Sequence, residues 1–129
     1  MKNLEQNIKK YLKERGWNGL RPSDVAKSIS IEAGELLELF QWTNDSLGKV
    51  KNNREKVELI KKELADVLIY CIDMSVILGF DTEKIIYDKL EKIKQKYPPE
   101  LVKKRSTKDS PANDNYWKIK KEHRMKGLS

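Results

Sequence analysis

The sequence predicts an all-α fold with a core of four helices, and three observations indicate this fold. Apolar residues recur at helical spacing in four long segments, and glycine, proline or polar residues separate each segment from the next. No segment alternates convincingly between polar and apolar residues, as a half-buried strand does. At 129 residues the chain is long enough for one domain with a substantial core.

The N-terminal part of the chain should contain two of these helices. The first is expected over about residues 2–15, where apolar side chains share one face and Gly16 supplies the stop signal. After a loop, Ser23 or Asp24 is expected to cap a second helix that runs to about Trp42.

The other two helices follow a polar connection. The third is expected over about residues 54–78, with Gly79 just beyond its end. Asp81 or Thr82 should cap the fourth helix, which reaches about Lys96. A Tyr-Pro-Pro sequence then closes it, because proline cannot continue a helix.

The net charge of +7 is unevenly distributed along the chain. Residues 98–129 carry nine Lys or Arg against four Asp or Glu, a net charge of +5, whereas residues 1–97 carry only +2. We therefore divide the chain into a helical domain, 1–98, and a basic C-terminal tail, 99–129, in which residues 115–125 could form one further short helix. The tail contains no nucleic-acid-binding motif, so we expect it to aid solubility or contact a subunit rather than bind nucleic acid.

Several protein classes are excluded by composition. No apolar run approaches the ~20 residues that a membrane span requires. The segment beginning at Met1 leads into a polar helix and lacks the apolar core of a signal peptide, so a cytoplasmic location is expected. Cys71 is the only cysteine, which rules out an internal disulfide, and its apolar neighbours indicate a core position.

Two acidic pairs stand inside apolar helical segments: Glu32 with Glu35, and Glu63 with Asp66. The i, i+3 spacing places both carboxylates of a pair on one face of a helix. Consecutive helices with a short connection usually pack antiparallel, which would bring the four carboxylates around one point. Such a group would repel itself without a cation, and carboxylate oxygens suit Mg²⁺ or Mn²⁺.

The alternative interpretation is that these acids are surface charges balanced by lysines. That interpretation suits Glu58 and Lys62, but it leaves acids flanked by isoleucine, leucine and valine unexplained. Glu38, one turn beyond Glu35, is either a further ligand or base or a solvated neighbour. A di-iron bundle requires Glu-x-x-His, and the only histidine, His123, lies in the tail, where we expect it at the surface.

Residues 32–42, EAGELLELFQW, and residues 63–70, ELADVLIY, resemble the MazG-like all-α nucleoside triphosphate pyrophosphohydrolases, and in particular the dCTP pyrophosphatase branch. The signature of this family is ExxE, a spacer and then ExxD, and the spacer here fits. The resemblance covers about residues 10–98 and leaves the tail outside it.

The resemblance implies hydrolysis of a (deoxy)nucleoside triphosphate between its α- and β-phosphates, giving a monophosphate and pyrophosphate, as in the clearing of non-standard or surplus nucleotides. At matching positions it implies four Mg²⁺ ligands, Glu32, Glu35, Glu63 and Asp66. It implies nucleotide contacts at Trp17, Trp42 and Tyr70, and a phosphate contact at Lys89. It also implies a homodimer or a dimer of dimers, in which dimerisation completes the core and the sites.

The chemistry of the residues agrees with this assignment. A bound Mg²⁺ would let a triphosphate approach an acidic site, and Glu35 or Glu38 could orient or deprotonate the attacking water. Lys89 lies among isoleucines on the expected buried stripe of the fourth helix. It could contact a phosphate there, or it could be a lysine whose stem covers the edge of the core.

Two positions depart from the family pattern. Ile93 stands where relatives usually carry asparagine, and Leu20 and Arg21 stand where the dCTP-preferring branch has a histidine. The base preference is therefore left open. Two other functions stay as alternatives: a phosphoribosyl-ATP pyrophosphohydrolase, which the Phe-Gln-Trp and Tyr-Pro elements disfavour, and a nucleic-acid-binding module acting through the tail.

Overall fold

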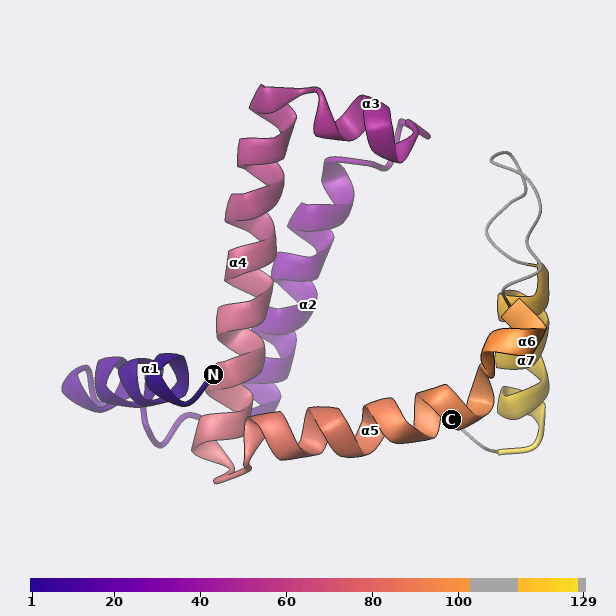
Figure 1. Ribbon diagram of the computed structural model, residues 1–129. Helices are drawn as coiled ribbons and strands as arrows, with labels where there is room; N and C mark the ends of the chain where they lie inside the picture. The colour runs from indigo at the N-terminus through magenta and orange to yellow at the C-terminus, as the bar shows by residue number, and fades with distance from the viewer. Residues whose placement is uncertain (103–113, 128–129) are drawn as a thin grey trace. The chain divides into compact units, whose positions relative to one another are not determined.

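The structure, a computed structural model, describes residues 1–102 and 114–127 of the chain (Figure 1). All regular secondary structure in these residues is helical, which confirms the predicted all-α class. The helices are α1 (Lys2–Glu14), α2 (Pro22–Glu38), α3 (Leu47–Lys51), α4 (Arg54–Ile77), α5 (Thr82–Lys96), α6 (Pro99–Val102) and α7 (Asp114–Met125). The helix predicted at residues 115–125 is thus confirmed as α7. The chain divides into two compact units, Met1–Thr82 and Glu83–Ser129.

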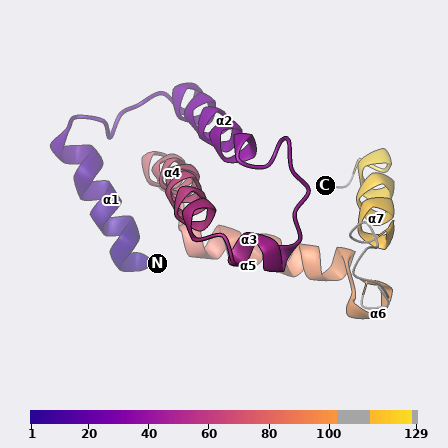
Figure 2. The ribbon, with the colours of Figure 1, turned by 90° about the horizontal axis from the view of Figure 1, so that it is seen from above.

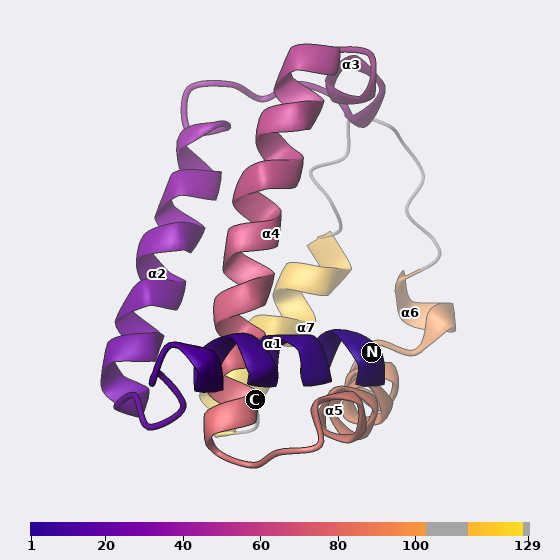
Figure 3. The ribbon, with the colours of Figure 1, turned by 90° about the vertical axis from the view of Figure 1, so that its left-hand side faces the viewer.

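Helices α2 and α4 form the central pair of the first unit. They pack side by side and run in opposite directions, as Figures 1 and 3 show. This is the antiparallel arrangement that the short connection predicts. Helix α4 also contacts α1, which crosses it near its C-terminal end (Figures 2 and 3).

The ends of α2 differ from the sequence-based expectation. Arg21, not Ser23 or Asp24, is the N-cap, and it caps without a side-chain hydrogen bond. Pro22 explains this start, because its ring presets the helical φ angle and it has no N–H group to satisfy. The helix also ends at Glu38, four residues before Trp42, because the bonds that follow tighten to i→i−3, such as the N–H of Leu39 to the carbonyl of Leu36 at 3.2 Å.

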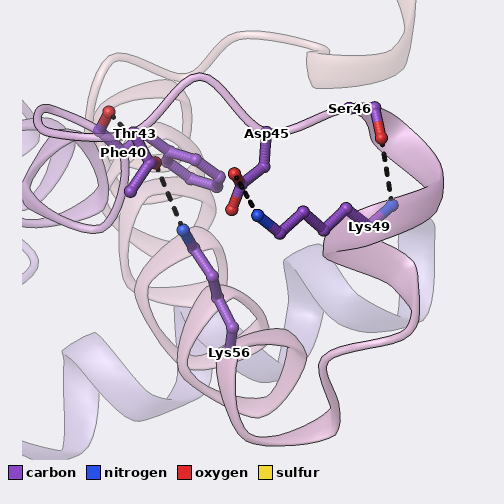
Figure 4. A network of polar contacts seen from close by, with 6 residues as sticks. All are labelled: Phe40, Thr43, Asp45, Ser46, Lys49 and Lys56. Carbon is purple, nitrogen blue, oxygen red and sulfur yellow. Dashed lines mark hydrogen bonds and ion pairs between the residues drawn. The ribbon is translucent and has the colours of Figure 1, made fainter.

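The connection between α2 and α4 contains the short helix α3, whereas the sequence predicts only a polar connection there. Ser46 caps this helix, and its hydroxyl accepts a hydrogen bond from the backbone N–H of Lys49 at 3.3 Å. The ammonium group of Lys49 also forms an ion pair with Asp45 at 3.2 Å (Figure 4). These two contacts hold the segment in a closed turn, although none of its side chains is fully buried.

Lys56, in the first turn of α4, ties the connection to the end of α2 (Figure 4). Its ammonium group donates to the Thr43 hydroxyl at 3.4 Å and stands 4.9 Å from the centre of the Phe40 ring. Its backbone N–H donates to the side chain of Asn53, the N-cap of α4, at 3.1 Å. One lysine thus fixes where α4 begins relative to the end of α2.

The buried core of the first unit lies where α1 meets α4. Ile8, Leu12 and Ile72 form it, and Val76 and Ile77 pack against them. Leu12 has only 1% of its surface exposed. The amphipathic face predicted for the first helix is therefore the face that packs on α4.

Two glycines end helices as the sequence predicts. Gly16 has φ +69° and Gly79 has φ +72°, the left-handed conformation that terminates many helices. After α1, the N–H of Trp17 donates to the carbonyl of Leu12 at 2.8 Å, and the N–H of Gly16 donates to the carbonyl of Lys13 at 3.1 Å. This Schellman-type ending turns the chain so that Trp17 returns toward the core.

A chain of polar side chains fastens α1 to the end of α4. The Thr82 hydroxyl donates to the carboxylate of Glu5 at 2.6 Å, and the Ser75 hydroxyl lies 2.6 Å from the Thr82 hydroxyl. Because Thr82 uses its only proton on Glu5, Ser75 is the donor in the second bond. Ser75 and Thr82 are both buried, so these bonds satisfy groups that water cannot reach.

Cys71, which the sequence analysis places in the core, is exposed in this single chain. Leu64 and Leu68, which share its face of α4, are exposed as well, and so is Leu78, the C-cap residue on the same face. We call these four residues the α4 stripe. The stripe is open because α1 and α2 pack on other faces of α4.

The isoleucines expected on a buried stripe of α5 are also exposed, and Ile86 shows 55% of its surface. Within its unit, α6 packs on α7. Among the described residues, no helix has both the length and the apolar character needed to cross a membrane.

Replacement of Glu5 by alanine tests the polar chain. Glu5→Ala should lower the free energy of unfolding by about 1–2 kcal/mol, because it leaves the buried Thr82 hydroxyl without its acceptor. Glu14→Ala removes the same side chain from the exposed end of α1 and should change this free energy by less than about 0.5 kcal/mol. Urea denaturation followed by circular dichroism measures both, and equal losses would contradict the assignment.

Candidate metal centre and adjoining cavity

The antiparallel packing of α2 and α4 brings the two acidic pairs together. Glu32 and Glu35 project from α2, and Glu63 and Asp66 project from α4. One carboxylate oxygen from each residue lies within 4.8 Å of the corresponding oxygens of the other three. Glu35 is exposed, and the other three are half-buried. We call these four residues the acidic cluster.

Two oxygens of the acidic cluster are buried without a partner. They are the Oε2 atoms of Glu32 and Glu63, neither of which accepts a hydrogen bond. Buried carboxylate oxygens in this state carry a desolvation cost that a protein normally offsets with a donor or a cation. The cluster therefore has the buried, unsatisfied acceptors of a cation site.

The pKa values of two cluster carboxyls reflect the same unfavourable burial of like charges. The pKa of the Glu35 carboxyl is raised above its ordinary 4.5, first because Glu32 shares a hydrogen bond with it and then because Glu32 adds negative charge. The pKa of the Glu63 carboxyl is also raised above 4.5, first by burial and then by the charge of Glu35. Without a cation, these groups resist carrying all their charges at once.

The donor set fits a hard divalent cation. All four side chains offer oxygen, the ligand type of Mg²⁺, Mn²⁺ and Ca²⁺, and the set contains no cysteine or histidine. Four oxygens near one point, two residues from each helix, could hold such an ion and leave other positions for water or a substrate.

Glu38, the other acid predicted at the site, lies outside the acidic cluster. It is the last residue of α2 and it is exposed. Its charge contributes to the raised pKa of Glu35, so the two carboxyls influence each other. Its place as a base or a ligand stays a prediction.

A cavity of about 650 Å³ adjoins the cluster. Asp66 belongs to both the cluster and the cavity wall. Three aromatic side chains belong to the rest of the lining: Tyr70 lies one turn after Asp66 on α4, and Tyr11 and Trp17 meet edge to face with their ring centres 5.9 Å apart. The full lining is Asn7, Ile8, Tyr11, Leu12, Trp17, Leu20, Asp24, Val25, Ser28, Asp66, Ile69, Tyr70 and Asp73.

The predicted nucleotide contacts fall into two groups. Trp17 and Tyr70 line the cavity, and Trp17 has 44% of its surface exposed. Trp42 lies beyond the end of α2, 87% exposed, and is not part of the lining. Lys89 is on α5, which is in the other unit apart from its first residue. The binding roles of all four stay predictions.

Asp73 and His123 differ from what the sequence predicts. Asp73 lines the cavity and is buried, yet it was not singled out. A signal was present, because Asp73 follows Asp66 by seven residues and Tyr70 by three, which is one face of a helix. His123, expected at the surface, is half-buried on α7.

Comparison with known proteins gives consistent matches. A model of the MazG-like family matches residues 27–110, which include both acidic pairs. dCTP pyrophosphatase 1 from Homo sapiens is 31% identical over 101 residues, or 76% of this chain and 59% of that protein. The Rattus norvegicus protein of the same name is 30% identical over 93 residues, or 70% of this chain and 55% of that protein. The chain thus spans somewhat more than half the length of these relatives.

A solved structure is similar as well. The crystal structure of a pyrophosphatase from Archaeoglobus fulgidus matches with a TM-score of 0.65 and 35% sequence identity. The match covers 76% of this chain and 92% of that one.

The raised pKa values of Glu35 and Glu63 predict how stability depends on pH. The folded, metal-free chain holds these protons more tightly than the unfolded chain does, so the stability they contribute is present at low pH. It is lost as the pH rises above 4.5 through the folded pKa values. In EDTA, the melting temperature should therefore fall more steeply from about pH 4 to pH 7 than in the double variant Glu35→Gln, Glu63→Gln. Parallel profiles would contradict this.

Proposed function

This chain belongs to the MazG-like family, and from that premise we propose that it is a metal-dependent nucleoside triphosphate pyrophosphohydrolase. It would cleave a (deoxy)nucleoside triphosphate between the α- and β-phosphates and release a monophosphate and pyrophosphate. The observation that carries the proposal is the convergence of four carboxylates beside a cavity whose lining includes three aromatic rings. The names of the relatives, dCTP pyrophosphatase and pyrophosphatase, support the same reaction class.

The acidic cluster would hold Mg²⁺, with Mn²⁺ as a substitute. When bound, the metal neutralises phosphate charge and acidifies a coordinated water. The buried, unpartnered oxygens of Glu32 and Glu63 support this assignment, because ligation would satisfy both. The two helices supply the ligands from fixed positions, so little reorganisation is needed when the substrate arrives.

The proton of the attacking water requires an acceptor near the cluster. Glu35 is suited to this, because it is the exposed member and the only one that substrate-side water can reach freely. Glu38 is the second candidate, placed one turn further along α2.

The cavity would hold the nucleoside. Trp17 and Tyr70 offer apolar, flat surfaces on which a base can stack, and Asp66 connects that cavity to the cluster where the phosphates would lie. The preferred base could be cytosine, as the names of the relatives suggest, or a modified base, in which case the enzyme would clear unwanted nucleotides. The resemblance assigns Lys89 to a phosphate and Trp42 to the nucleotide.

A homodimer, or a tetramer formed from two dimers, would complete the fold. The α4 stripe gives the physical reason: it exposes Leu64, Leu68, Cys71 and Leu78 on the helix that carries half of the acidic cluster. Exposed apolar residues gathered on one helix face in this way are normally covered in a stable protein. We propose a second copy of the chain as its cover.

Replacement of single cluster residues tests the reaction class. Glu63→Gln and Asp66→Asn should each abolish Mg²⁺-dependent pyrophosphate release, because each removes one charged ligand while keeping the shape of the side chain. Activity would be measured with a panel of canonical and modified nucleoside triphosphates, with Mg²⁺ and with EDTA. Circular dichroism should show unchanged helix content in both variants.

Glu58→Gln is the matched control, because Glu58 lies on the outer face of α4, paired with Lys61 at 2.9 Å. This variant should retain full activity. Turnover retained by both cluster variants, or turnover by the wild type in EDTA, would refute the metal assignment.

The α4 stripe predicts the oligomeric state. The chain has a mass of 15.1 kDa, and light scattering should give twice or four times that value in solution. Leu68→Asp should reduce it to the single-chain value, because it places a charge in the middle of the interface. Glu58→Lys, at an exposed and ion-paired position of the same helix outside the stripe, is the control. A monomeric wild type would refute the proposed oligomer.

A further inference from the structure

We propose that Asp73 recognises the exocyclic amino group of the substrate's base, and that the chain therefore favours amino-bearing bases over uracil and thymine. This inference rests on the proposed function, because it takes the acidic cluster to hold the phosphates. It adds a residue that sets specificity for that reaction.

Asp73 is a buried acid that lacks a partner. Only 4% of its surface is exposed, and its Oδ1 atom accepts no hydrogen bond. Burial raises the pKa of its carboxyl. A buried acceptor without a donor is costly, so its presence in the wall of a cavity points to a donor supplied by a ligand.

The position of Asp73 relative to the cluster fits a nucleotide. Asp66, Tyr70 and Asp73 follow one another at i, i+4 and i+7 on one face of α4, and all three line the cavity. The rise of an α-helix places Asp73 about 10 Å from Asp66 along the axis. Phosphates held at the Asp66 end would leave the sugar beside Tyr70 and the base at the Asp73 end.

The rest of the lining suits a base and disfavours a phosphate at that end. Tyr11 and Trp17 provide aromatic surface for stacking. The charged residues of the lining are all acidic: Asp24, Asp66 and Asp73. A cavity with this charge repels anions away from the metal, and it attracts groups that donate hydrogen bonds.

The hydrogen-bonding edges of the bases explain the selectivity. An ionised Asp73 only accepts hydrogen bonds, and it can accept them from the amino group of cytosine, adenine or guanine. Uracil and thymine offer one N–H flanked by two carbonyl oxygens, and these oxygens would face the ionised, acceptor-only carboxylate unfavourably.

Two substitutions separate this role from a structural one. Asp73→Asn keeps the shape but adds an N–H donor, which can pair with the carbonyl of uracil or thymine while the amide oxygen accepts from the neighbouring ring N–H. Asp73→Leu has no polar atoms and should raise the melting temperature, because it removes a buried acid without a partner. Asp88→Asn makes the first change at an exposed residue, ion-paired with Lys84 at 2.7 Å, and serves as the control.

The experiment compares kcat/KM for dCTP, dATP and dGTP with that for dUTP and dTTP, in Mg²⁺. The wild type and Asp88→Asn should favour the best amino-bearing substrate by about tenfold or more. Asp73→Asn should shrink this ratio mainly by improving the use of dUTP and dTTP. Asp73→Leu should shrink it by weakening the use of the amino-bearing substrates. Ratios that stay unchanged in both variants would overturn the proposal.

Binding of products tests Asp73 separately from turnover. Calorimetry with dCMP and dUMP in Mg²⁺ should show tighter binding of dCMP to the wild type and nearly equal binding to Asp73→Asn. If the wild type released no pyrophosphate but bound dCMP selectively through Asp73, the proposed function would fail and the inference would stand. Equal binding of both, or binding of neither, would overturn the inference.

Discussion

The packing of α2 against α4 has to hold four like charges within a few ångströms of one another, and much of the first unit serves that requirement. One oxygen from each member of the acidic cluster lies within 4.8 Å of the others, while two further oxygens are buried without partners. A bare cluster of this kind pushes the helices apart. The helices must therefore be held by contacts elsewhere, such as those of Lys56 with Thr43 and Phe40 at the connection.

Other contacts decide where the cavity lies. The Schellman-type ending of α1 brings Trp17 back toward the core, and the bonds from Ser75 to Thr82 to Glu5 fix α1 across the end of α4. The wall facing α4 is thus built from the first helix, the loop after it and the first turns of α2. Metal binding and base recognition would then rest on different packing contacts, although Asp66 belongs to both regions.

The parts of this arrangement that could be predicted from sequence are those governed by local chemistry. Gly16 and Gly79 end their helices because few other residues adopt a positive φ, and the i, i+3 acids share faces because of helical geometry. The start of α2 was misjudged because Pro22 removes the need for the side-chain cap that Ser23 suggested. Cys71 and Asp73 were misjudged or missed because periodicity identifies a face and not what covers it.

The acidic cluster and the cavity depend on contacts at different separations along the chain, so they differ in what must fold before each can form. The acidic cluster is assembled from residues 32–66, in two helices joined by a short connection, and it needs only that hairpin to form. The bond from Thr82 to Glu5 closes a loop of 77 residues, so docking of α1 costs more chain entropy. Contacts that are local in sequence form faster than those that close long loops. The metal-binding hairpin would therefore form before the cavity, and a cation captured at that stage would stabilise the hairpin until α1 docks.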